Sequence, residues 1–79
     1  MQQEQIKQLI ESTLSNAEVM IEGDGTHFTV IVISPLFEQQ SRVKRQQLVY
    51  DAVRKELLDG SLHALSIKTY TPDEWKKQV

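Results

Sequence analysis

The first half of the chain shows a helical pattern of apolar positions, followed by an extended one. Four apolar residues recur at the spacing of one helical face: Ile6, Leu9, Ile10 and Leu14. This pattern predicts an amphipathic first helix. β-branched and aromatic residues then dominate residues 17–33, on both sides of Gly23-Asp24-Gly25. Because an Asp-Gly step favours a tight turn, this stretch predicts two strands joined as a hairpin.

The second half predicts a helix, a strand and a closing helix. Ser34-Pro35 suits a strand end followed by a short helical turn. From about residue 41 to residue 58, one helical face is apolar: Val43, Val49, Ala52, Val53 and Leu57. Gly60 is well placed to end this helix, and residues 64–70 are typical of a strand. Thr71, Pro72 and Glu74 then form the capping box of a last helix.

This order of elements, α-β-β-α-β-α, predicts the arrangement of the sheet. The hairpin strands must be antiparallel, whereas the second and third strands are joined through a helix and are most simply parallel neighbours. We therefore expect an α+β fold with a three-stranded mixed sheet and helices packed on it, in a single domain over residues 1–79. His27 begins the second strand and His63 the third, so both should lie at the same end of the sheet.

Composition excludes several classes of function. The chain has 79 residues, no cysteine and no apolar run near the ~18 residues that a membrane span needs. We therefore expect a soluble, cytoplasmic protein without membrane contact. Lack of cysteine excludes a thiol redox enzyme, a thiol nucleophile and a structural zinc finger built by this chain alone.

Charge is unevenly spread along the chain, whose net charge is −2. Residues 40–55 form a basic segment that holds a single acid, Asp51. Its basic residues are Arg42, Lys44, Arg45, Arg54 and Lys55. Such a segment can face nucleic acid or an acidic partner, although a solvated helix face is the commoner meaning. Sequence alone leaves these alternatives open.

The two histidines are candidate metal ligands. Neutral imidazole binds iron, zinc and copper well, but a single histidine beside a turn is more often structural. His27 and His63 cannot complete a tetrahedral site, and Asp24 is the only carboxylate near these turns. If a metal binds here, the missing ligands should come from another molecule.

Three segments resemble the BolA-like proteins: "DGTHFTVIVIS", "SRVKRQQLVYDAV" and "LHALSIKTYTPDEW". The resemblance covers essentially the whole chain and implies a class II KH-like fold. It also implies a heterodimer with a monothiol glutaredoxin, bridged by a [2Fe-2S] cluster. By resemblance, the glutaredoxin cysteine and a glutathione thiol supply two ligands, His63 a third and His27 the fourth. Many family members have a histidine where this chain has Gln46, so no role can be carried over to that position.

The resemblance leaves the direction of cluster traffic open: storage, sensing and delivery to client apoproteins all fit. Loss of an imidazole ligand on protonation, near the ~6.5 of free imidazole, would suit an acid- or stress-linked role.

The second hypothesis is a KH-like transcriptional regulator that binds nucleic acid through Arg42, Lys44 and Arg45. Two observations oppose it: a loop that reads "GDGT", with Asp24 repelling phosphate, and a pI of about 5.6. We expect no enzymatic activity, because no nucleophile elbow, phosphate loop or paired-carboxylate arrangement accompanies the histidines.

Overall fold

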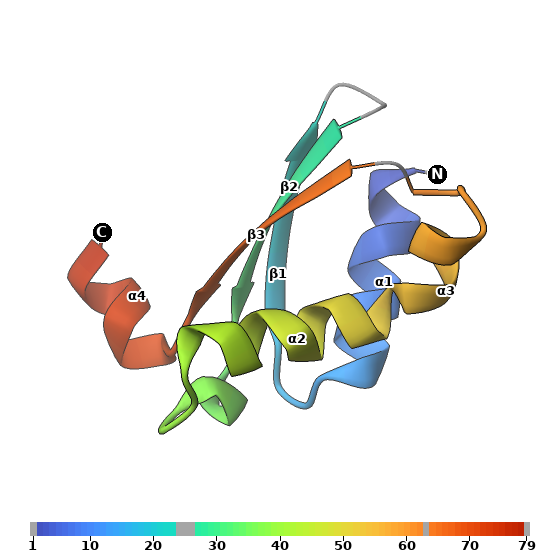
Figure 1. Cartoon of the computed structure of the whole chain (residues 1–79). Helices are drawn as coiled ribbons and strands as arrows, with labels where there is room; N and C mark the ends of the chain where they lie inside the picture. Colours follow the sequence, from blue (N-terminus) through green and yellow to red (C-terminus); the bar gives the residue numbers. More distant parts are fainter. Residues whose placement is uncertain (1, 24–26, 63, 79) are drawn as a thin grey trace.

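A computed structural model describes residues 2–23, 27–62 and 64–78 of the chain (Figure 1). Its elements are α1 (Gln3–Thr13), β1 (Glu18–Gly23), β2 (His27–Ile33), the 3₁₀ turn η1 (Pro35–Phe37), α2 (Arg42–Ala52), α3 (Arg54–Leu58), β3 (Ala64–Tyr70) and α4 (Pro72–Gln78). The predicted α+β order is confirmed, with one helix divided in two. Among the described helices, none has the length and apolar character needed to cross a membrane.

The sheet has the order β1-β2-β3, with β2 in the centre. β1 and β2 pair antiparallel from Glu18 opposite Ile33 to Gly23 opposite Phe28. β2 and β3 pair parallel, from His27 opposite Ala64 to Ile33 opposite Tyr70. The predicted mixed sheet is therefore confirmed, and its central strand is bonded on both sides.

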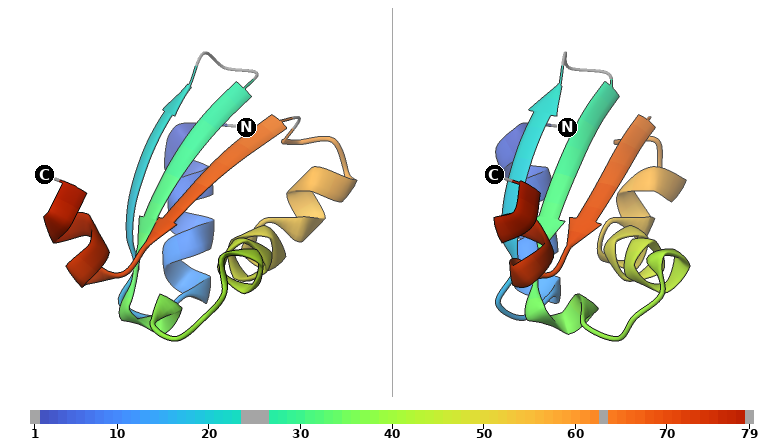
Figure 2. Two further views of the ribbon diagram at one scale, coloured as in Figure 1. Left: turned by 60° about the vertical axis from the view of Figure 1, so that its left-hand side comes forward. Right: turned by 90° about the vertical axis from the view of Figure 1, so that its left-hand side faces the viewer.

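Alternation along the strands gives the sheet one apolar face, which α1 and α2 cover (Figure 2). The buried residues on this face come from all three strands: Val19, Phe28, Val30, Val32 and Ile67. α1 packs on it through Ile6 and Ile10, at the predicted helical spacing, and α2 through Val49. Buried apolar area stabilises a fold by ~25 cal/mol per Å². The apolar layer between the sheet and the two helices is therefore the main stabilising contact of this small domain.

The opposite face of the sheet, which we call the open face, is more polar. The register groups its residues in three rows: Glu18, Ile33 and Tyr70; Met20, Ile31 and Lys68; Glu22, Thr29 and Ser66. α4 lies on this side of the sheet, at the end where the row of Glu18, Ile33 and Tyr70 lies (Figures 1 and 2). There Trp75 packs on Tyr70, with ring centroids 5.3 Å apart.

The single helix expected over residues 41–58 is divided at Val53, so this prediction was wrong in its continuity. Val53 has φ −120° and ψ 17°, and its N–H donates to the carbonyl of Tyr50, three residues back. A β-branched residue leaves helical geometry at low cost, and here the side chain stays fully buried. Val43, expected on the apolar face, is 78% exposed.

The predicted end of this helix and start of the next are confirmed. Gly60 follows α3 with φ 82°, a left-handed conformation that residues other than glycine rarely adopt. At α4 the Glu74 N–H donates to Thr71 Oγ1 at 3.1 Å, and the Thr71 N–H donates to Glu74 Oε1 at 2.9 Å. These two bonds are the expected capping box.

Ser34 is a buried polar residue that links the loop after α1 to the 3₁₀ turn η1. Its side chain is 0% exposed, donates to the Ser15 carbonyl at 3.0 Å and accepts from the Leu36 N–H at 3.1 Å. Ser34→Ala should therefore lower the free energy of unfolding by about 1–3 kcal/mol, because it removes two hydrogen bonds made by a buried hydroxyl. Urea denaturation measures this, with Ser12→Ala on an exposed helix position as the control. Equal small losses in both variants would contradict the prediction.

Candidate functional site

The start of β2 meets the start of β3 at one end of the sheet, which we call the His27 edge. His27 is exposed and lies opposite Ala64 in the register. Its Nε2 lies 3.1 Å from Ser66 Oγ, two residues further along β3 on the same face. Such a contact holds the imidazole ring in one orientation on the open face.

Gly23 fixes the backbone beside this histidine. A Cβ at position 23 would lie 2.5 Å from the backbone oxygen of His27 and 2.6 Å from a ring carbon of Phe28. β1 can therefore approach the start of β2 this closely only with glycine at its end. The same glycine that suggested a turn in the sequence also sets the spacing of the two strands.

Two of the predicted site residues, His63 and Asp24, lie outside the described residues. The residue that follows His63 in the chain is Ala64, the partner of His27. The starts of β2 and β3 lie at the same end of the sheet, as the order of elements predicts. Within residues 2–23, 27–62 and 64–78 no group of three or more His, Cys, Asp or Glu side chains is arranged to hold a metal. The metal-ligand role of His27 and His63 stays a prediction.

The three basic residues proposed for nucleic acid do not share one surface. Arg42 and Arg45 line an open groove of about 510 Å³ between α2, β3 and α4. Lys44 is exposed on the same helix but does not line this groove. The three basic residues are close together in the sequence, but Lys44 does not share the groove with Arg42 and Arg45.

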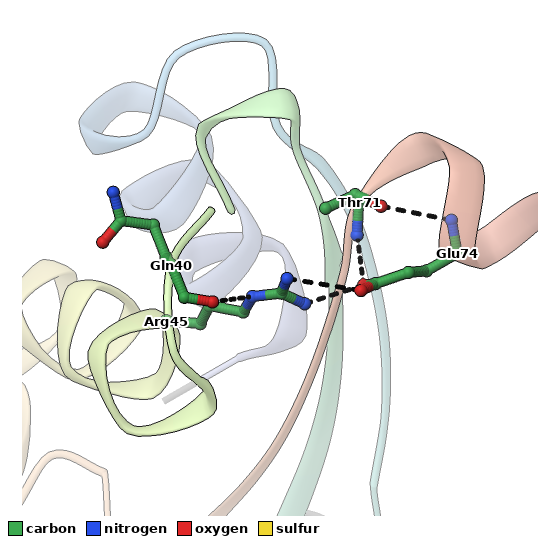
Figure 3. A network of polar contacts seen from close by, with 4 residues as sticks. All are labelled: Gln40, Arg45, Thr71 and Glu74. Atoms are coloured by element: carbon green, nitrogen blue, oxygen red, sulfur yellow. Dashed lines mark hydrogen bonds and ion pairs between the residues drawn. The ribbon is translucent and has the colours of Figure 1, made fainter. Parts of the chain in front are cut away.

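Arg45 is engaged in the fold (Figure 3). Its two terminal nitrogens lie 2.7 and 3.3 Å from the oxygens of Glu74, and its Nε donates to the Gln40 carbonyl at 3.1 Å. The guanidinium carbon also lies 5.9 Å from the centre of the Phe37 ring. A bidentate pair of this kind orients both side chains. Arg45 thus fastens α4 to α2 and offers little charge to a ligand.

Gln46, to which the family resemblance carries over no role, faces the middle of β3. Its Nε2 donates to the Ile67 carbonyl at 3.4 Å. This contact lies on the groove side of β3 and not at the His27 edge. The Gln46 side chain thus satisfies a carbonyl of β3 that faces away from β2.

Sequence reasoning missed the contact of Ser66 with His27, the pairing of Glu74 with Arg45, and the groove itself. Ser66 could have been found from the register, since pairing His27 with Ala64 puts it two residues along on the same face. The groove combines residues from three separate elements: Arg42 and Arg45 on α2, Lys68 on β3, and Glu74 and Lys77 on α4. No local motif signals such a combination.

Known proteins resemble this chain over nearly its whole length. Residues 2–74 match the family model described as BolA-like protein. The "Acid stress protein IbaG" of Escherichia coli is 44% identical over 77 residues, which are 98% of this chain and 92% of that protein. A solved bolA protein homologue from Coxiella burnetii is 45% identical, with a TM-score of 0.85 and coverage of 96% and 97% of the two chains. Yeast Fra2 is 30% identical, with a TM-score of 0.75 and coverage of 98% and 86%.

The Arg45–Glu74 pair should make the docking of α4 depend on acid. The hydrogen bond from Arg45, and then that from the Thr71 N–H, hold the pKa of Glu74 below its usual 4.5. A carboxyl with a lowered pKa stabilises the fold above its unfolded-state pKa and loses that contribution as pH falls through the folded value. Fluorescence of Trp75, the only tryptophan, should therefore report loosening of α4 below about pH 4.5.

Glu74→Gln should remove this pH dependence, whereas Asp73→Asn removes a neighbouring charge outside the Arg45 contact and should retain it. An unchanged acid transition in Glu74→Gln would contradict the role of the pair.

Proposed function

Because the chain belongs to the BolA-like protein family, we propose that it is the histidine-donating partner of a monothiol glutaredoxin. In the proposed heterodimer a [2Fe-2S] cluster is shared between the two proteins. The glutaredoxin cysteine and a glutathione thiol supply two ligands, and His63 and His27 of this chain supply the others. The isolated chain is not expected to hold the cluster by itself.

One observation carries the proposal: the pairing of His27 with Ala64 joins the two histidine-bearing segments at one end of the sheet. His27 is exposed there, so a second protein can approach it. Imidazole is a suitable ligand for iron, and two imidazoles leave ligand positions for thiolates from a partner. Imidazole in place of thiolate on one iron raises the potential of such a cluster.

The two histidines should not be equivalent. The Nε2 of His27 already contacts the Ser66 hydroxyl at 3.1 Å. For this nitrogen to bind iron, the contact has to be given up, or the ring has to use Nδ1 instead. We therefore expect His63 to contribute more to cluster binding than His27.

The name of the E. coli relative links that protein to acid stress. Protonation removes the lone pair with which an imidazole binds iron, so cluster binding should weaken in acid. The proposed site is therefore sensitive to acid, in line with a role in stress.

The direct test is the visible spectrum of this protein mixed with a monothiol glutaredoxin, iron, sulfide and glutathione, compared with the glutaredoxin alone. His63→Ala should abolish or strongly alter the charge-transfer bands of the mixed complex without unfolding the protein. His27→Ala should cause a smaller change, and Ser66→Ala, which removes the hydroxyl that contacts His27 Nε2, should keep the bands. Wild-type bands in His63→Ala would refute the ligand assignment; complete loss in both histidine variants would refute the ranking.

A second prediction separates the glutaredoxin proposal from nucleic-acid binding. Lys44 and Lys55 are exposed on α2 and α3, and neither belongs to the paired strands that carry His27 and Ala64. Lys44→Glu combined with Lys55→Glu should leave the coloured heterodimer intact, since exposed charges contribute only about 0–1 kcal/mol each. A nucleic-acid complex that uses these lysines would instead weaken, and its salt slope would fall by about one unit per contact. Loss of the heterodimer in the folded double variant would mean that the glutaredoxin binds the helical side.

A further inference from the structure

The basic groove runs along the outer edge of β3. Four consecutive residues of this strand, residues 67–70, line it together with residues of α2 and α4. Side chains of consecutive strand residues point to opposite faces, so a surface that touches all four must follow the backbone edge. β3 is an edge strand, because the sheet order is β1-β2-β3.

The outward peptide groups of this edge are those of Ile67 and its alternate neighbours. The Ile67 carbonyl accepts from the Gln46 side chain on the groove side, whereas the Tyr70 carbonyl accepts from the Ser34 N–H on the β2 side. Alternation then places the N–H and the carbonyl of Thr69 on the groove side. A side-chain amide thus takes the place that a fourth strand would occupy.

The two flanks of the groove are basic. Arg42 contributes from α2, and Lys68 and Lys77 from the open face and α4. All three side chains are exposed, and among the described residues none of them takes part in an ion pair, whereas Arg45 is neutralised by Glu74. Positive charge therefore lies on both sides of a strand edge that pairs with no further strand of the described sheet.

We infer that this groove binds an extended acidic peptide segment of a partner protein, which adds to β3 as a fourth strand. Main-chain hydrogen bonds to Thr69 hold its backbone, and the Ile67 carbonyl becomes available to it only if the Gln46 side chain gives up its hydrogen bond there. Its side chains alternate between the α2 flank and the α4 flank. Since Arg42 stands on one flank and Lys77 on the other, the segment needs consecutive acidic residues, not alternating ones.

The groove favours a peptide over a nucleic acid. A strand edge offers donors and acceptors in the spacing of another peptide backbone, whereas a phosphate backbone needs a larger set of cations to bind well at physiological salt. The groove lies about 10–20 Å along β3 from the His27 edge, at ~3.3 Å per residue. Its occupation is independent of the proposed cluster, so either proposal can fail without the other.

The test uses the full chain, without iron or glutaredoxin, and a fluorescein-labelled peptide in which a run of glutamates is flanked by threonine and valine. Fluorescence anisotropy at low salt should show saturable binding that weakens as salt is added. The same peptide with glutamines in place of the glutamates should bind at least tenfold more weakly. Two further peptides carry N-methyl groups on one or the other alternate set of amides; only one set should abolish binding, because only one faces β3.

Arg42→Glu and Lys77→Glu should each weaken binding about tenfold, because each replaces an attraction by a repulsion. Lys44→Glu carries the same change on the same helix outside the groove and should alter the affinity less than about twofold. Thr69→Pro removes the outward N–H at an edge position that tolerates proline, and should abolish binding while the circular dichroism spectrum stays that of the folded protein.

Three results would overturn the inference. The first is an equal loss of affinity in Arg42→Glu, Lys77→Glu and Lys44→Glu, which would mean a diffuse charge effect. The second is equal binding of both N-methylated peptides, which excludes strand addition even if Thr69→Pro fails to fold. The third is a single-stranded oligonucleotide that binds more tightly than the peptide and depends on Arg42 and Lys77, which would assign the groove to nucleic acid.

Discussion

The fold depends on the parallel pairing of β2 with β3. β2 is the central strand, and its core-face residues Phe28, Val30 and Val32 are all buried under α1 and α2. Pairing with β3 fixes which residues share the open face, because a shift of one residue would exchange the two faces. Both candidate sites follow from this register. At one end it joins His27 to the start of β3, and along the outer side it exposes the edge that lines the groove.

Much of this arrangement can be predicted from the sequence, because it is encoded locally. The spacing of Ile6 and Ile10 predicts α1, and the run of residues 64–70 predicts β3 with its observed bounds. The Thr71–Glu74 capping box and Gly60 act within one turn of chain, so their chemistry can be read directly. The shared edge of the histidine-bearing segments follows from strand order alone. The proposed cluster and the proposed partner, in turn, come from the family resemblance and not from local patterns.

The remaining features arise from contacts between distant segments. Val53 ends α2 because its buried side chain fits the core with a non-helical backbone, which no periodicity shows. The partner of Arg45 is Glu74, 29 residues further along the chain. Only the folded chain reveals that Arg45 and Arg54 of the basic segment are paired with carboxylates, whereas Arg42 takes part in no ion pair among the described residues. A charge count along the sequence therefore overstates the free positive charge on this segment.

The long-range pairing also has a consequence for the order of folding. His27 and Ser66 are 39 residues apart, whereas the hairpin of β1 and β2 closes over a few residues. Non-local strand pairs must overcome loop-closure entropy before they gain any contact energy, so they form slowly compared with hairpins and helices. In the nascent chain both hairpin strands are synthesised before β3. The end of the sheet where the two histidine-bearing segments meet therefore forms late, because it needs β3 to pair with β2.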